Sequence, residues 1–105
     1  MCGTIENKTA HRVLHCDHWR KRADDYNYYN NTGHKYCAKG SEHWVHPGDT
    51  TRKHVDVDAL YVPRHKTIHA YLNCPLTIGR GWATDLTHQN GGWFKFATDC
   101  LVSLG

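Results

Sequence analysis

The chain has 105 residues, which fits one domain, and a formal net charge of +3 with its histidines counted as neutral. Its hydrophobic fraction is 39%, and no apolar run is long enough to cross a membrane. Charges of both signs are mixed along the chain, and the one basic run, at residues 20–22, is followed by two aspartates. We therefore expect a single domain over residues 1–105 with a mildly basic surface, without a membrane span or a basic nucleic-acid-binding arm.

Short β-prone segments separated by turn residues are expected in the first half, where helix signals are nearly absent. Residues 3–6 and 12–16 are expected to form a first hairpin. Residues 17–25 are the one stretch that tolerates a helical turn, with Asp17 as its cap. Residues 26–33 are polar and rich in tyrosine and asparagine, which predicts an exposed loop suited to recognition.

The second half predicts more strands, with the clearest alternation of apolar and polar residues in two segments. In residues 55–61, Asp56 and Asp58 are expected to face solvent. In residues 67–74, every second residue from Ile68 to Cys74 is expected to be buried. The remaining expected strands are residues 35–38, 43–46, 78–85, 93–97 and 101–104. Seven to nine short strands at this spacing predict an all-β fold, a small disulfide-stabilised sandwich or barrel.

Five cysteines in so short a chain, none in a CxxC pair, predict a disulfide framework and therefore a secreted, extracellular protein. No charged and apolar leader precedes Cys2, so we expect the sequence of a mature form. Five choices of the unpaired cysteine and three pairings of the other four leave fifteen two-bridge connectivities open. Pairing by proximity in sequence joins Cys16 to Cys37 and Cys74 to Cys100.

Histidine is unusually frequent, with ten residues. His11, His15 and His18 have the spacing of one helical face, which would suit zinc or copper. On a strand the same spacing divides them between two faces, and Val13 and Leu14 favour a strand. We therefore expect surface imidazoles and no cofactor, with a metal site at these three histidines as the alternative.

A hydrolase of the ribonuclease type needs a general base, a general acid and a cation that neutralises the phosphate. Glu42, His43, Arg80 and His88 could supply these groups. Arg80 stands between two glycines, which would let a ligand approach the backbone closely. Glu42 and His43 are adjacent, so a strand would point them to opposite faces, which weakens this alternative.

Aromatic residues exceed what a thin core requires, with four tryptophans and six tyrosines. Three tryptophans in expected strands, Trp44, Trp82 and Trp93, are interpreted as core. A surface patch of aromatic and basic side chains is expected instead in the polar first third, together with the turn near residue 80. Its residues are Trp19, Arg20, Arg22, Tyr26, Tyr28, Tyr29 and Arg80.

These patterns favour a secreted binding module over an enzyme. Its expected partner is an extracellular protein or a glycan, and not a nucleic acid. The domain would act as an effector or as a non-catalytic subunit of a larger secreted toxin complex. A secreted ribonuclease-type hydrolase is the alternative.

Overall fold

The computed structural model describes residues 3–20, 28–30, 36–52, 55–76, 79–97 and 99–105. Within these ranges the chain forms nine strands and no α-helix. The strands are β1 (Thr4–Asn7), β2 (Val13–Cys16), β3 (Tyr28–Asn30), β4 (Glu42–Val45), β5 (Ala59–Val62), β6 (Thr67–Cys74), β7 (Gly79–Thr87), β8 (Gly92–Lys95) and β9 (Leu101–Leu104). No helix that could cross a membrane occurs in these ranges.

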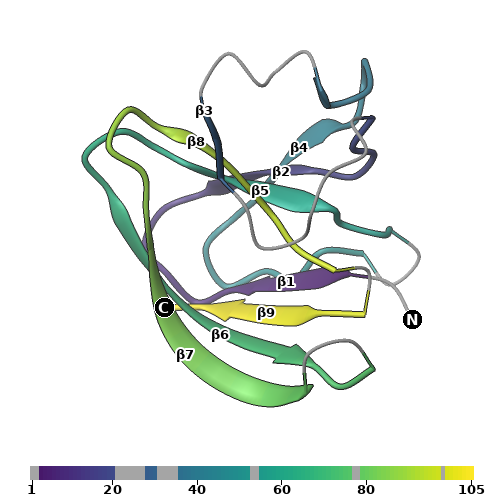
Figure 1. The fold of residues 1–105 in the computed structure, drawn as a ribbon, viewed down its shortest axis with the longest axis vertical. Coiled ribbons are helices and arrows are strands. Elements are labelled where there is room, and N and C mark those ends of the chain that lie inside the picture. Colours follow the sequence, from purple (N-terminus) through teal and green to yellow (C-terminus); the bar gives the residue numbers. More distant parts are fainter. Residues whose placement is uncertain (1–2, 21–27, 31–35, 53–54, 77–78, 98) are drawn as a thin grey trace.

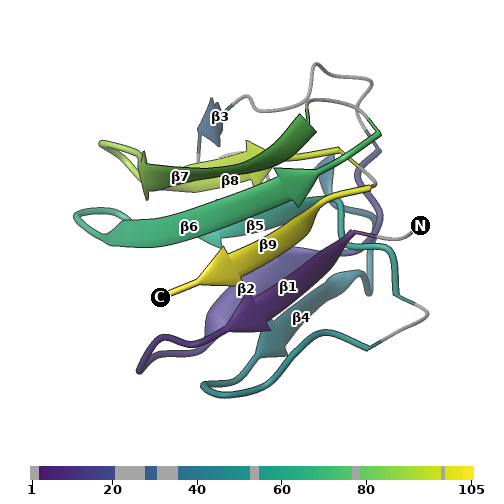
Figure 2. The same cartoon turned by 90° about the horizontal axis from the view of Figure 1, so that it is seen from below.

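The strands form two sheets that pack face to face (Figure 1). One sheet has four strands in the order β1-β9-β6-β7, and the other has five in the order β3-β8-β5-β2-β4. Strand β1 pairs with β9 in parallel, while β6 pairs with both β7 and β9 in the antiparallel sense. Figure 2 shows the two layers from the side of the four-stranded sheet. The predicted all-β sandwich is confirmed.

The main core lies between the sheets and follows the alternation of the sequence. In β6, Ile68, Ala70, Leu72 and Cys74 are buried, while the residues between them are exposed or half-buried. This is the pattern predicted for residues 67–74. Leu60 and Val62 of β5 enter the same core from the opposite sheet.

A second apolar cluster covers the outer face of the five-stranded sheet. Its buried members are Cys16, Trp19, Cys37, Ala59 and Trp93. The Trp19 ring contacts the Trp93 ring at a centroid distance of 5.8 Å. Because successive residues of β5 point to opposite faces, Leu60 joins the main core and Ala59 joins this cluster. The five-stranded sheet is therefore apolar on both faces.

Two disulfides join segments that are distant in sequence. Cys16 at the end of β2 is bonded to Cys37, and Cys74 at the end of β6 is bonded to Cys100 just before β9. The predicted pairing is confirmed for these four cysteines, and Cys2 lies outside the described residues. Two disulfides are compatible with an oxidising, extracellular environment.

The predicted first hairpin is wrong, because β1 and β2 belong to different sheets. The buried Asn7 directs the chain from one sheet to the other. Its side-chain amide donates to the carbonyl oxygens of His11, at 2.8 Å, and Val45, at 2.9 Å. These bonds satisfy a polar group that would otherwise be costly to bury, and they hold the crossover in place.

The predicted strand over residues 55–61 begins only at Ala59. Before it, Asp56 accepts a hydrogen bond from the Gly3 N–H and Asp58 accepts one from the Trp19 N–H, both at 2.8 Å. These two carboxylates therefore bind backbone N–H groups of other segments. They do not lie on the solvent-facing side of a strand, as the sequence had predicted. Burial raises the pKa of Asp58. The hydrogen bond from the Trp19 N–H acts in the opposite direction and offsets part of this rise.

Two further expectations are corrected around the Cys16–Cys37 disulfide. Residues 36–38 form no strand, because Cys37 makes a single bridge to Trp19. Residues 28–30, expected in a loop, form β3 at the edge of the five-stranded sheet, where they pair with β8. The other residues of that expected loop lie outside the described part of the chain.

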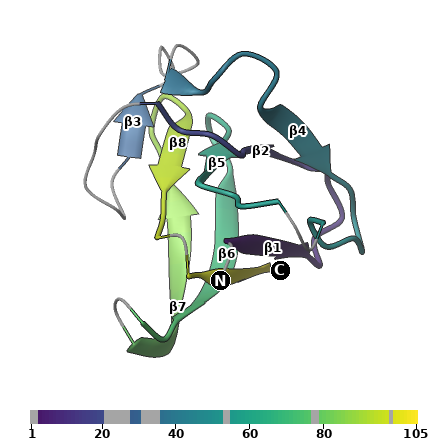
Figure 3. The ribbon, with the colours of Figure 1, turned by 90° about the vertical axis from the view of Figure 1, so that its right-hand side faces the viewer.

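The segment after β4 closes one side of the sandwich (Figure 3). It leaves the five-stranded sheet and runs beside β1, where Thr50 forms a bridge with Glu6. The Ile5 N–H donates to the Thr51 hydroxyl at 3.0 Å, and the Thr51 N–H donates to the Ile5 carbonyl at 2.9 Å. This segment and β4 form the walls of a pocket.

Candidate functional site

Two pockets flank the edge strand β4, and Trp44 lines both. The first, here called the histidine pocket, has a volume of about 560 Å³ and is bounded by the end of β2, by β4 and by residues 46, 49–52 and 55. Its polar and charged lining includes His15, Asp17, His43, His46, Asp49 and Arg52. The second, here called the basic pocket, has a volume of about 650 Å³ and lies where β2 and β6 begin and β5 ends.

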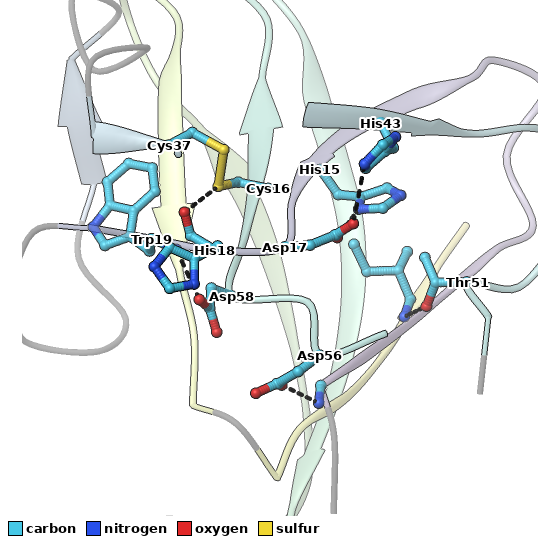
Figure 4. A network of polar contacts seen from close by, with 12 residues as sticks. His15, Cys16, Asp17, His18, Trp19, Cys37, His43, Thr51, Asp56 and Asp58 are labelled. Carbon is cyan, nitrogen blue, oxygen red and sulfur yellow. Dashed lines mark hydrogen bonds and ion pairs between the residues drawn. A yellow bond between two sulfur atoms is a disulfide. The ribbon is translucent and has the colours of Figure 1, made fainter. Parts of the chain in front are cut away.

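In the histidine pocket, one carboxylate lies between two imidazoles (Figure 4). Strands β2 and β4 pair with His15 opposite His43, so both rings lie on the same face of the sheet. Asp17 follows β2 directly. Its Oδ1 lies 2.6 Å from His15 Nδ1, and its Oδ2 lies 3.6 Å from His43 Nε2.

The two imidazoles differ in exposure. The His15 side chain is 6% exposed and that of His43 is 56% exposed, with 6.0 Å between their ring centroids. When the His15 ring is neutral, the contact with the Asp17 carboxylate favours the tautomer with the proton on Nδ1, in which Nε2 carries the lone pair. The carboxylate therefore favours one tautomer and orientation of one ring beside a second, accessible one. This arrangement is suited to general acid–base chemistry.

The basic pocket combines an apolar floor with cationic walls. Val13 and Ile68 are buried members of the main core that also line this pocket, so they form its floor. Lys8, Arg12 and Lys66 line it, and no aspartate or glutamate does so among the described residues. A ligand in this pocket would meet positive charge and apolar surface together.

Arg12 is held in place by a tryptophan. Its guanidinium carbon lies 3.9 Å from the centre of the Trp44 ring, a cation–π contact. Trp44 is 45% exposed, so its interpretation as core is wrong, whereas Trp93 is fully buried and Trp82 packs against the core. The alternation of β4 explains the exposure, because Val45 faces the interior and Trp44 faces the other way.

A second histidine–aspartate pair lies on the four-stranded sheet. His69 of β6 pairs with Asp85 of β7, and the distance from Nδ1 to Oδ1 is 2.5 Å. The two side chains are 68% and 63% exposed. His69 lines the basic pocket at its rim.

Trp19, which was expected in the aromatic surface patch, does not lie at the surface. Trp19 is 8% exposed and packs among Cys16, Cys37 and Trp93, so it belongs to the interior. Arg20 is exposed, and its backbone N–H donates to the Tyr36 carbonyl. For Tyr28, Tyr29 and Arg80, the structure describes the backbone but not the side chains. Arg22 and Tyr26 lie outside the described residues.

Three of the four residues expected for a hydrolase do not converge: Glu42, His43 and His88. Glu42 and His43 point to opposite faces of β4, since Glu42 lies opposite Cys16 of the outer cluster. His88 follows β7, at the edge of the other sheet. His43 instead meets His15, which was expected to be a surface imidazole or, as the alternative, a metal ligand, and Asp17, which was expected to cap a helical turn.

The expected metal alternative is not supported. His11 and His18 are exposed, whereas His15 is buried beside Asp17. Across the described ranges, no group of three or more histidine, cysteine, aspartate or glutamate side chains could hold a metal ion. The spacing of the three histidines would place them on one face of a helix. His15 lies in the strand β2, so this spacing does not bring them together.

The basic pocket could not be expected from the sequence pattern. Arg12, Trp44 and Lys66 come from three segments that only the sheet order brings together. Period-two alternation against Val45 could have placed Trp44 outside the core. Nothing in the sequence indicated that Arg12 would lie on its ring.

Comparison with protein-family models, with curated proteins and with solved structures finds no match for this chain.

Proposed function

We propose that this chain is an extracellular binding module that recognises an acidic glycan in the basic pocket. One observation carries the proposal: Arg12 lies on the exposed Trp44 ring at the wall of a pocket that no acidic side chain of the described residues lines. The two disulfides support an extracellular location, because such bonds persist in oxidising compartments.

The pocket chemistry favours a ligand with two kinds of surface. A carboxylate or sulfate group would accept hydrogen bonds from the Arg12 guanidinium, whose planar fork matches such oxygens. Lys8 and Lys66 add positive charge. The C–H face of a sugar ring would pack on the Tyr61 ring and on the apolar floor at Val13. Acidic sugars combine these two surfaces within one or two rings.

The pocket size also favours a small ligand over a flat protein surface. A volume of about 650 Å³ lies within the range of roughly 300–1,000 Å³ that is typical of ligand pockets. The preformed contact between Arg12 and Trp44 reduces the ordering cost of binding. An extracellular protein partner, the other partner expected from the sequence, would make more use of flat or protruding surface.

Isothermal titration calorimetry with a sulfated, uronic-acid-containing tetrasaccharide and its desulfated, carboxyl-reduced form tests the proposal. The acidic form is expected to bind and the neutral form to bind at least tenfold more weakly, because charge-assisted hydrogen bonds contribute about 1.5–3 kcal/mol. Arg12→Ala should weaken binding of the acidic form by about tenfold or more for the same reason.

Matched controls separate the pocket from general surface charge. Lys39→Ala removes an exposed cation outside the pocket, and Tyr71→Ala removes an exposed aromatic residue on the other sheet. Both variants should bind as the wild type does. Equal binding of acidic and neutral sugars, or equal losses in Arg12→Ala and Lys39→Ala, would contradict the proposal. Capture of a protein partner without glycan binding would replace it.

A further inference from the structure

We infer that the histidine pocket is a second, catalytic site that cleaves RNA, with His15 as general base and His43 as general acid. This inference does not depend on glycan binding. It rests on the contacts among His15, Asp17 and His43 (Figure 4). The sequence suggested such a reaction from other residues, and the structure assembles these three instead.

His15 is prepared to accept a proton at one defined atom. In the neutral ring, Nδ1–H donates to Asp17 Oδ1 at 2.6 Å, and the Nε2 lone pair can then act as a base. The ring is 6% exposed and lines the pocket, so its position is set by packing as well as by the carboxylate. Asp17 acts through His15 as a positioning residue.

His43 is placed to return a proton on the other side of the reacting group. Its ring lies 6.0 Å from the His15 ring between centroids, and it is 56% exposed. At this separation, one phosphate group can form hydrogen bonds to both rings. The interplanar angle of 43° shows that the two rings are tilted and not stacked.

The side chains of the pocket suggest the substrate class. Among its described lining residues there is no serine or cysteine; the hydroxyls belong to Thr50 and Thr51, and that of Thr51 accepts the Ile5 N–H. RNA carries its nucleophile, the 2′-hydroxyl, next to the phosphate. It needs from the protein only a base, an acid and a cation. Arg52 lines the pocket and supplies the cation.

The proposed step balances without any co-reactant. His15 Nε2 takes the proton of the 2′-hydroxyl while the 2′-oxygen forms a bond to phosphorus. The bond from phosphorus to the 5′-oxygen breaks, and its electron pair leaves with that oxygen, which takes a proton from His43. The products are a 2′,3′-cyclic phosphate and a free 5′-hydroxyl, and proton exchange with water restores both rings.

Two other charged groups at the pocket should affect substrate binding in opposite directions. Arg52 attracts the phosphate, and Asp49 is a second carboxylate that opposes it. Arg52→Ala should therefore raise KM, whereas Asp49→Asn should lower it. His46 also lines the pocket and faces the same space.

The test uses the purified chain and a fluorescent RNA oligonucleotide, with an all-DNA oligonucleotide of the same sequence as control. RNA should be cleaved to 2′,3′-cyclic phosphate ends, and DNA should stay intact because it lacks the nucleophile. His15→Ala and His43→Ala should each lower kcat by about 100-fold or more, the usual contribution of one acid or base. Asp17→Asn should lower kcat and change the bell-shaped pH profile.

Asp85→Asn and His88→Ala are the matched controls, because they remove an aspartate and a histidine outside the pocket. Both should cleave RNA as the wild type does. His43 is more than half exposed, so His43→Ala keeps the test decisive even if His15→Ala fails to fold. Intact RNA with the folded wild type would overturn the inference. Cleavage that survives in His43→Ala, or extends to DNA, would do the same.

Discussion

Two of the histidine–aspartate contacts among the described residues, His15–Asp17 and His69–Asp85, are similarly short, but their surroundings differ. The His15–Asp17 distance is 2.6 Å and the His69–Asp85 distance is 2.5 Å. The first pair is nearly buried beside a second imidazole, and the second pair is exposed on the four-stranded sheet.

The difference shows that a short contact does not by itself make a site. Around His69, water competes for both side chains and screens their charges, so the exposed pair contributes about 0–1 kcal/mol. Around His15, packing holds the ring, and His43 supplies a second proton-transfer group. The pocket environment therefore makes the first pair a candidate for catalysis.

The largest expected effect concerns the disulfide next to the buried pair. Cys16 lies between His15 and Asp17, so removing its bond to Cys37 should loosen both. Replacing both cysteines by alanine should lower the free energy of unfolding by about 3 kcal/mol, measured by urea denaturation.

The Cys74–Cys100 disulfide provides the control for this prediction. Its removal should cost a similar free energy of unfolding, since the loop it closes has a similar length. Hydrogen exchange at β2 should rise beyond the global effect only when the Cys16–Cys37 bond is removed. Equal hydrogen exchange at β2 after both changes would contradict a specific effect of the Cys16–Cys37 bond on this strand.

Truncation of the two histidines should differ by several-fold in its effect on stability. His15→Ala removes a buried ring and leaves the partner oxygen of Asp17 with one bond fewer, at a cost of about 2–3 kcal/mol. His69→Ala should cost less than about 1 kcal/mol, because both partners are already solvated. Equal losses in thermal or urea unfolding would contradict the distinction between the pairs.

Asp58 extends the comparison to a half-buried carboxylate bonded to backbone. Its folded pKa is raised by burial above the ordinary value of 3.8, so the folded state holds the proton more tightly than the unfolded state. Stability should therefore be greatest at low pH for this group and fall as pH rises through the raised pKa. Asp58→Asn, which keeps an acceptor for the Trp19 N–H, should remove this fall in pH-dependent unfolding curves.

Asp56→Asn is the matched control for that prediction. Asp56 also accepts a backbone N–H, from Gly3, at the same distance of 2.8 Å. The fall in stability assigned to Asp58 should persist in this variant, slightly reduced because the Asp56 charge adds to the effect of burial in raising the pKa of Asp58. If it disappears in Asp56→Asn and remains in Asp58→Asn, the assignment is wrong.

The smallest expected effect is that of Asp85→Asn. Because the His69–Asp85 pair is exposed, this change should alter the free energy of unfolding of the protein by less than about 0.5 kcal/mol at physiological salt. The matched change, Asp17→Asn, should cost about 1–2 kcal/mol, since it weakens a charge-assisted hydrogen bond in a nearly buried site. Reversal of this order would show that burial does not separate the pairs.

Much of the fold could be predicted from the sequence, because it depends on local patterns. Alternation identified β6, and proximity along the chain gave both disulfides. The wrong hairpin had a non-local cause, since the buried amide of Asn7 takes its partners from two segments. Local pattern cannot reveal such a crossover.

The candidate sites were harder to predict, because each combines several strands. His15 meets His43 only through the register of β2 with β4, and Asp17 has no motif around it. Trp19 was expected at the surface since its neighbours in sequence are polar. It is buried because Cys37 and Trp93 pack around it. Cross-strand contacts of this kind require the sheet order.

The most direct test of glycan recognition is two-dimensional NMR of the labelled protein during titration with the sulfated tetrasaccharide. We expect the signals of Arg12, Lys66 and Ile68 in the basic pocket to shift in a saturable way. Those of His15 and Thr51 in the histidine pocket should stay in place. Shifts confined to the histidine pocket, or no saturable shifts at all, would contradict the proposed binding site.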